Sequence, residues 1–188
     1  MTGRIPHRPQ KRSIYIGCEG ASEVGYAALL QDFIDDAGLA VHLKIDELAP
    51  GAGDPLARIE LAVDRIARLA KKRTAPSAAF VLLDTDQLAL DRDRANRAQR
   101  MAADSDITIV WQTTCFEAIL LRHLPNRATH RPPDTPAAEN AIIRDWPGYK
   151  KGLSRTELAK RINLDSVLQA AGVEPELAGL LRELGLLA

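Results

Sequence analysis

The strongest chemical signal in the sequence is a pair of aspartates after its most apolar strand-like segment. Residues 78–84 (AAFVLLD) end in Asp84, and Asp86 follows two positions later. Two carboxylates with this spacing at a strand end can converge on one hard cation, and magnesium prefers such oxygen ligands. The alternative is an acidic turn that binds nothing, because Asp is common where strands end.

A second acidic position follows the first strand-like segment, residues 13–18 (SIYIGC). Glu19 is an unusual residue directly after such an apolar run, and Gly20 would let the backbone turn tightly or approach a phosphate. A surface Glu in a turn is the alternative. Crowded carboxylates repel one another, and a divalent cation relieves that repulsion. Glu19, Asp84 and Asp86 together therefore predict a Mg²⁺ site, which Mn²⁺ could also occupy.

Two further glutamates and two lysines could contribute to such a site. Glu23 and Glu117 lie near the starts of two predicted helices, where the helix dipole alone favours a Glu. Lys150 and Lys151 follow a Pro-Gly turn and could hold a phosphate oxygen or stabilise transition-state charge. A solvated lysine pair is the alternative.

The elements that must position these residues alternate regularly up to residue 124. Apolar runs predict strands, and helical spacing predicts helices between them, at strands 13–18, 39–45, 78–84 and 107–112 and helices 21–36, 55–73, 91–103 and 115–124. This order predicts an α/β fold with a mainly parallel four-stranded sheet flanked by helices. Right-handed crossovers bring all strand ends to one edge, where ligands bind in such folds. Glu19, Asp84 and residues 112–114 are expected there.

The predicted organisation has three regions. Residues 1–12 form a basic tail, residues 13–124 the α/β core, and residues 125–188 a loop with a C-terminal helical extension. Four prolines in residues 125–137 predict a loop, and the segment 145–152 (DWPGYKKG) follows. Ser154 and Glu157 form a capping-box signature for a helix to about Ile162. Two more short helices are predicted at residues 165–171 and 175–184.

Composition limits the classes of function. Among 188 residues, 25 Lys and Arg balance 25 Asp and Glu, so a strongly basic nucleic-acid binder is not indicated and phosphate binding must rest on local patches. The aromatic content of 4% argues against a base-stacking surface. Cys18 and Cys115 form no C-x-x-C pair. No run of 18 apolar residues predicts a membrane span, and the default expectation is a cytoplasmic protein.

The joint pattern resembles the RloB-like family. The segment 19–26 (EGASEVGY) resembles the family's opening motif after its first strand, and 82–86 (LLDTD) is similar to its D-x-D strand end. The segment 111–123 (WQTTCFEAILLRH) is similar to its later strand and C-F-E helix, and 149–151 (YKK) resembles its C-terminal Y-x-K element. Order and spacing agree over about residues 13–160. The chain departs from the pattern at Val24-Gly25, Gln112-Thr113 and Ala118.

The resemblance implies a Toprim-like core that binds magnesium for phosphodiester chemistry. It also implies a nuclease acting on nucleic acid, in a phage-defence or restriction-associated system with a partner ATPase. The implied metal ligands are Glu19, Asp84 and Asp86, and Glu19 would be the catalytic acid or base. Further implied site residues are Glu117 and Lys151 as catalytic residues and Gly20, Glu23 and Lys150 as substrate-binding residues.

Two other functions compete with the nuclease. The chain could be a non-catalytic partner subunit of an ATPase complex that docks through its C-terminal helices. The segment 83–86 (LDTD) also mimics the first motif of haloacid dehalogenase-type phosphatases. That motif normally lies on the first strand, whereas here two predicted strands precede it and Glu19 stays unexplained. The sequence leaves open DNA or RNA, endo- or exonuclease action, and the oligomeric state.

Overall fold

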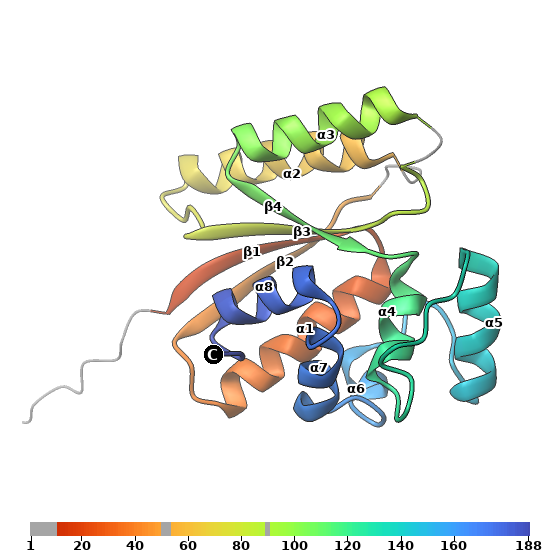
Figure 1. Ribbon diagram of the computed structural model, residues 1–188. Coiled ribbons are helices and arrows are strands. Elements are labelled where there is room, and N and C mark those ends of the chain that lie inside the picture. Colours follow the sequence, from red (N-terminus) through yellow and green to blue (C-terminus); the bar gives the residue numbers. More distant parts are fainter. Residues whose placement is uncertain (1–10, 50–53, 89–90) are drawn as a thin grey trace, which may run out of the picture.

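A computed structural model describes residues 11–49, 54–88 and 91–188 (Figure 1). Its strands are β1 (Arg12–Cys18), β2 (Val41–Glu47), β3 (Ala78–Asp84) and β4 (Ile107–Gln112). Its helices are α1 (Ala21–Asp36), α2 (Pro55–Lys71), α3 (Arg92–Asp104), α4 (Phe116–His123), α5 (Thr135–Asp145), α6 (Arg155–Leu158), α7 (Leu164–Ala171) and α8 (Pro175–Leu184). Most of the expected basic tail, including Arg4 and Arg8, lies outside the described residues.

The four strands form one parallel sheet in the order β2-β1-β3-β4, which confirms the predicted fold class. Side chains alternate along β1, so that Ile14 and Ile16 pack on one face and Tyr15 on the other. The inner strands are buried on both faces over residues 14–18 of β1 and 79–83 of β3, which explains why these stretches contain no charged side chain. Because the strands are parallel, β1 and β3 end at the same edge of the sheet.

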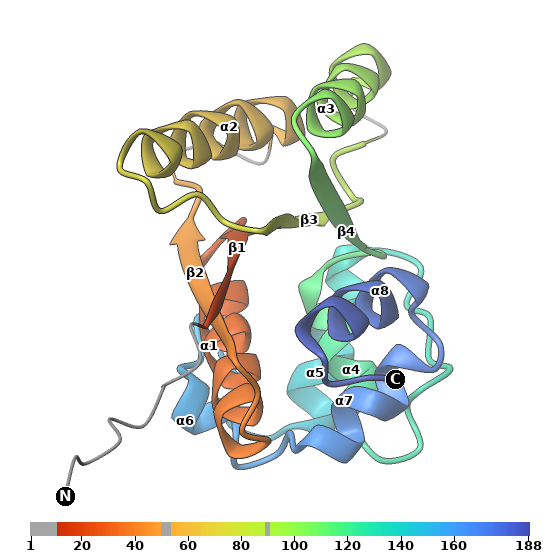
Figure 2. The same ribbon diagram turned by 90° about the vertical axis from the view of Figure 1, so that its left-hand side faces the viewer.

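Helices cover both faces of this sheet. Figures 1 and 2 show α2 and α3 over one face and α1, α4, α7 and α8 over the other. The two hydrophobic clusters follow the same division: β1 and β3 contribute Ile16 and Leu82 to the larger cluster, and Tyr15 and Val81 to the smaller one under α2 and α3. Burial of apolar side chains on both sides therefore fixes the sheet, and with it the positions of the strand ends.

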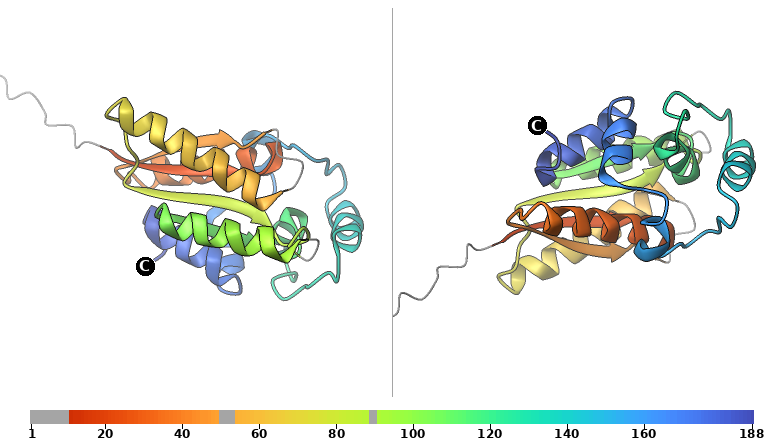
Figure 3. Two further views of the ribbon diagram at one scale, coloured as in Figure 1. Left: turned by 90° about the horizontal axis from the view of Figure 1, so that it is seen from above. Right: turned by 90° about the horizontal axis from the view of Figure 1, so that it is seen from below.

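The C-terminal helices belong to the larger of these clusters. Val167 of α7 and Leu177, Leu180 and Leu181 of α8 are buried together with Ile14 of β1. The right-hand view of Figure 3, from below, shows α7 and α8 against the same side of the sheet as α1. The division of the chain at residue 124 stays a prediction, but the helices after it supply part of the core.

The expected loop over residues 125–137 is wrong at its end, because α5 begins at Thr135. The side chain of Asp134 caps this helix by accepting a hydrogen bond from the backbone N–H of Ala137. Proline content suggested a loop, but Pro136 lies in the first helical turn, where its missing N–H costs nothing. The helix packs on α4 beside the C-terminal edge of the sheet (Figure 3).

Smaller differences concern element ends. The capping box of Ser154 and Glu157 is present, but α6 ends at Leu158, not near Ile162. The second strand is shifted by two residues to Val41–Glu47, because Gly38 adopts a left-handed conformation (φ 67°) and the N–H of Leu39 still bonds back to α1. Within the described part of the chain, no helix is long and apolar enough to cross a membrane.

Candidate functional site

Glu19 and Asp84 meet at the C-terminal edge of the sheet. Glu19 follows β1 and Asp84 ends β3, and these two strands are neighbours. The Glu19 carboxylate accepts a hydrogen bond from the backbone N–H of Asp84, with 3.1 Å between Oε2 and N. Parallel pairing of β1 with β3 therefore brings together two acidic residues that are 65 positions apart in the sequence.

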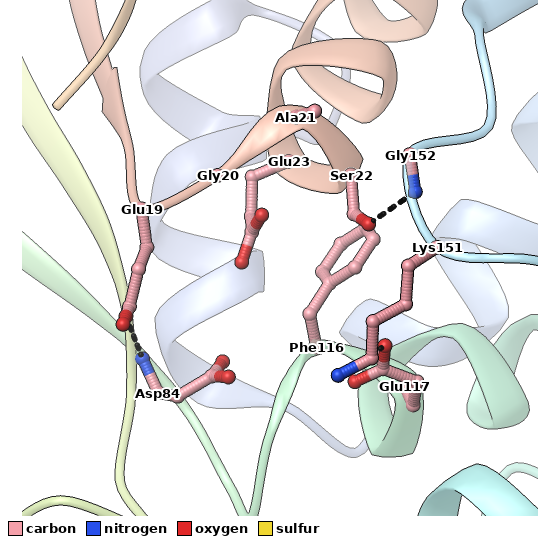
Figure 4. Close-up of a pocket in the computed structure, with 10 residues that line it drawn as sticks. All are labelled: Glu19, Gly20, Ala21, Ser22, Glu23, Asp84, Phe116, Glu117, Lys151 and Gly152. Atoms are coloured by element: carbon pink, nitrogen blue, oxygen red, sulfur yellow. Dashed lines mark hydrogen bonds and ion pairs between the residues drawn. The ribbon is translucent and has the colours of Figure 1, made fainter. Parts of the chain in front are cut away.

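A pocket of about 340 Å³ opens at this point (Figure 4). Its walls come from the β1–α1 junction, the end of β3, the start of α4 and the segment before α6, with the lining residues Glu19, Gly20, Ala21, Ser22, Glu23, Asp84, Phe116, Glu117, Lys151 and Gly152. Four carboxylates and one lysine thus share a small space. In Figure 4 the side chains of Glu19, Glu23 and Asp84 point toward a common space.

The charge in this pocket is poorly compensated. Burial, together with the nearby carboxylates of Glu23, Glu19, Asp86 and Glu117, raises the pKa of Asp84 to about 9. Burial likewise raises the pKa of Glu23 to about 8. The Oδ1 atom of Asp84 is buried without a hydrogen-bond partner. A buried acceptor without a partner lowers the stability of the folded protein, so binding of a proton or a cation at this atom would be favourable.

Asp86 stands beside the pocket and is not part of its lining. Its Oδ2 accepts a hydrogen bond from the hydroxyl of Thr135 at 2.9 Å, which ties it to the start of α5. Its charge still acts on Asp84 and raises the pKa of that group. Asp86 therefore lies close to the acidic pocket, but its carboxylate is hydrogen-bonded to the first residue of α5.

Glu117 and Lys151 lie near each other in the wall of the pocket formed by α4 and the segment before α6. The Tyr149 hydroxyl donates a hydrogen bond to Glu117 Oε1 at 3.0 Å. Lys151 Nζ lies 2.6 Å from Glu139 Oε1 on α5 and 3.8 Å from Glu117 Oε1, and its side chain is 65% exposed. Lys151 can therefore exchange Glu139 for another anion at little cost, because exposed ion pairs are weak.

Two of the residues expected in the site behave differently from expectation. Lys150 is exposed and does not line the pocket; its charge acts on Glu157 of α6 instead. Gly20 does line the pocket, but its φ of −152° is an extended conformation that any residue can adopt. The turn into α1 therefore does not depend on glycine at this position, and the approach of a phosphate to Gly20 stays a prediction.

Arg58 is the main site residue that the sequence interpretation missed. It is only 7% exposed, and its Nη1 donates hydrogen bonds to the carbonyl oxygens of Glu19, at 2.6 Å, and of Leu48. Its positive charge lowers the pKa of Glu19, in opposition to the larger effect of burial. A signal was available, since Arg58 precedes Ala62 by four residues and so lies on the apolar face of α2.

The donor chemistry of the pocket fits a hard cation, although the ligands are not preassembled. All nearby acidic groups offer carboxylate oxygens, and Asp84 Oδ1 has no competing partner. In the described ranges, however, no group of three or more His, Cys, Asp or Glu side chains is arranged to hold a metal ion. Asp86, bonded to Thr135, would have to turn to complete the set. The residues fit magnesium by chemistry and charge.

Comparison of the chain with known protein families, with curated proteins and with solved structures finds no match.

Proposed function

We propose that this chain is a magnesium-dependent phosphodiester hydrolase that cleaves nucleic acid. The observation that carries the proposal is the buried, unpartnered Oδ1 of Asp84 in a pocket shared with Glu19, Glu23 and Glu117. Carboxylates crowded at the ends of parallel strands favour a bound cation over an empty site. The resemblance of these residues to the RloB-like pattern supports the same chemistry and suggests a Toprim-like core.

Magnesium, or manganese in its place, would be held by Glu19, Asp84 and Asp86. When bound, the ion would polarise the phosphodiester and lower the pKa of a water molecule. Arg58 keeps the main chain of Glu19 in place through its hydrogen bond to the carbonyl oxygen. Lys151, released from Glu139, can meet a phosphate oxygen at the pocket mouth. Tyr149 holds Glu117 toward Lys151.

The biological setting belongs to the same proposal. The RloB resemblance suggests a phage-defence or restriction-associated system and a partner ATPase. A neutral net charge is compatible with delivery of the substrate by such a partner, because the chain has no overall electrostatic attraction for nucleic acid. A cytoplasmic location belongs to the same proposal.

The decisive experiment measures ion binding and cleavage in the same variants. Titration calorimetry and thermal unfolding with Mg²⁺ and Mn²⁺ should show binding and a rise of several degrees in Tm for the wild type. Asp84→Asn should lose both responses and all metal-dependent cleavage of single- and double-stranded DNA and RNA. Asp64→Asn, a matched change at an exposed site on α2, should behave like the wild type. Full cleavage by Asp84→Asn would refute the proposal.

A non-catalytic partner subunit is the second candidate, and two observations favour it. The described residues hold no preassembled metal-ligand group. A cavity of about 500 Å³ between α7 and α8 is also lined by the apolar side chains of Leu168, Val173 and Leu187 together with Arg182. If wild type and Asp84→Asn bind no metal and cleave nothing, yet both raise ATP hydrolysis by a co-purified ATPase equally, this second function holds.

A further inference from the structure

A second cavity, of about 500 Å³, lies at the other end of the sheet from the acidic pocket. It forms where β1 begins, between the adjacent strand β2 and the turn that joins α2 to β3, and its lining residues are Lys11, Arg12, Ser13, Lys44, Arg73, Thr74, Ala75 and Ser77. The seven residues of β1 span about 20 Å at the rise of a β-strand, so the two cavities are separate sites.

The lining of this cavity is basic, with four cations, three hydroxyl side chains and no carboxylate. Lys11 pairs with Asp35 and Arg12 with Glu183, and both acidic partners stand outside the lining. These pairs are two-fifths to one-half exposed, so each contributes little stability and can yield to a stronger anion. Lys44 and Arg73 are exposed and form no ion pair with any described residue.

The helix dipole accounts for only part of this charge. Arg73 directly follows the C-terminus of α2, where a cation is favourable in any protein. Arg12 donates a hydrogen bond to the carbonyl oxygen of Glu183 in the last turn of α8, and Lys11 pairs with Asp35 in the last turn of α1. Lys44 lies in the middle of β2, so no helix end explains its charge. Cations from three separate segments therefore converge on one cavity without carboxylates in its lining.

Backbone hydrogen bonds fix the wall that presents Arg73. Both the N–H and the hydroxyl of Thr74 donate to the carbonyl oxygen of Leu69, at 3.0 and 3.1 Å. The N–H and the hydroxyl of Ser77 donate to the carbonyl oxygen of Ser13, at 2.8 and 3.0 Å. The turn between α2 and β3 is thus tied to α2 at one end and to β1 at the other. A ligand would pay little to order this wall.

We infer that this cavity binds the phosphate groups of a phosphodiester or polyphosphate chain. Four cations in one lining suit phosphate oxygens, and the absence of aromatic residues from the lining leaves no platform for a base. Binding is therefore sequence-independent and salt-dependent. The inference stands whether or not the acidic pocket hydrolyses nucleic acid, because the two sites share no residue.

The test measures binding in EDTA, so that the acidic site holds no metal. Fluorescence anisotropy follows a labelled 12-nucleotide strand of thymidylates at 50 and 200 mM salt, and tripolyphosphate is the second probe, as competitor and in thermal unfolding. The test variant is Lys44→Gln/Arg73→Asn, since Asn tolerates the left-handed conformation of Arg73 (φ 58°). The control is Arg92→Gln/Arg97→Gln on exposed positions of α3, which removes the same charge.

The test variant should bind about tenfold more weakly, and its salt slope should fall by about 1.4 for two lost contacts to a single strand. The control should stay within about twofold of the wild type. Binding of the strand that requires Lys44 and Arg73 identifies nucleic acid as the source of the phosphates. The same dependence for tripolyphosphate alone identifies a polyphosphate chain.

Equal affinities of the test and control variants for both probes would overturn the inference, as would the failure of both probes to bind the wild type at 50 mM salt. Asp84→Asn should bind the probes like the wild type. A chain without metal-dependent cleavage can therefore still satisfy this inference, and a nuclease can still fail it.

Discussion

Within the candidate site, Asp84 is the residue whose burial most reduces the stability of the folded protein. Its carboxyl group is buried, one of its oxygens has no partner, and three other carboxylates line the same pocket. In the unfolded chain the group ionises near 3.8, whereas in the folded protein its pKa is about 9. Between these values the folded state binds more protons than the unfolded state, so rising pH destabilises the fold. A functional site commonly carries such a cost.

This cost predicts that Asp84→Asn stabilises the metal-free protein at alkaline pH. In EDTA at pH 8 we expect a gain of about 1–3 kcal/mol in the free energy of unfolding, because the neutral amide does not have to take up a proton on folding, as the ionised carboxylate of the wild type does. The gain should shrink as pH falls and vanish below the unfolded-state pKa of 3.8, where the wild-type carboxyl is protonated in both states. Urea unfolding at several pH values measures the difference. A gain independent of pH, or an equal gain from Asp64→Asn, would contradict this account.

At the scale of elements, α1 fixes the segment that carries Lys151 to the pocket. The N–H of Gly152 donates a hydrogen bond to the hydroxyl of Ser22, at 2.9 Å. One turn further along α1, a Cβ on Gly25 would lie 2.2 Å from the carbonyl oxygen of Leu153. Only a glycine allows this approach of backbone to helix. The glycine in α1 therefore sets where Lys151 stands relative to Glu117.

We predict that Gly25→Ala destabilises the protein, by about 2 kcal/mol or about 5 °C in Tm, because the methyl group displaces the segment around Leu153. Gly179→Ala is the matched control in α8, where an added Cβ meets nothing within 4 Å. It should raise stability by about 0.5 kcal/mol through a smaller loss of chain entropy. Thermal unfolding of both variants measures the contrast, and equal effects of the two substitutions would disprove the role of Gly25.

At the scale of the whole molecule, the charges of a neutral chain are separated along the strands. The acidic pocket lies at the C-terminal edge of the sheet and the basic cavity at its N-terminal end. Helices α7 and α8, which are far from β1 in the sequence, support one face of the sheet between the two sites, because they pack in the cluster that contains β1 and α1. The geometry of the acidic pocket consequently depends on the last quarter of the chain.

Leu181→Ala should therefore destabilise the whole fold, and not only its C-terminus. Leu181 is fully buried in the main cluster, so its truncation is expected to cost about 2–5 kcal/mol. Urea unfolding followed by far-UV circular dichroism should show one transition at lower urea, whereas Leu187→Ala, at a partly buried position, should change it little. A separate early transition of small amplitude, with the main one unchanged, would indicate that α7 and α8 form an independent appendage.

Local patterns sufficed to predict much of this structure. Apolar runs and helical spacing predicted all four strands and most helices, because an element buried on one or two faces places apolar residues at regular intervals in the sequence. The convergence of Glu19 and Asp84 also followed from the sequence alone. Strand alternation with helices implies a parallel sheet, and a parallel sheet brings the ends of its strands to one edge.

Only the tertiary structure decided which side chains complete the pocket. Arg58 bonds to the Glu19 carbonyl, Thr135 holds Asp86, and Lys151 faces Glu117 while Lys150 does not. These contacts join residues up to 49 positions apart and depend on how helices rotate and dock on the sheet. Periodicity specifies the buried face of each element, but the partner of a polar side chain is set by packing between elements, which no local pattern encodes.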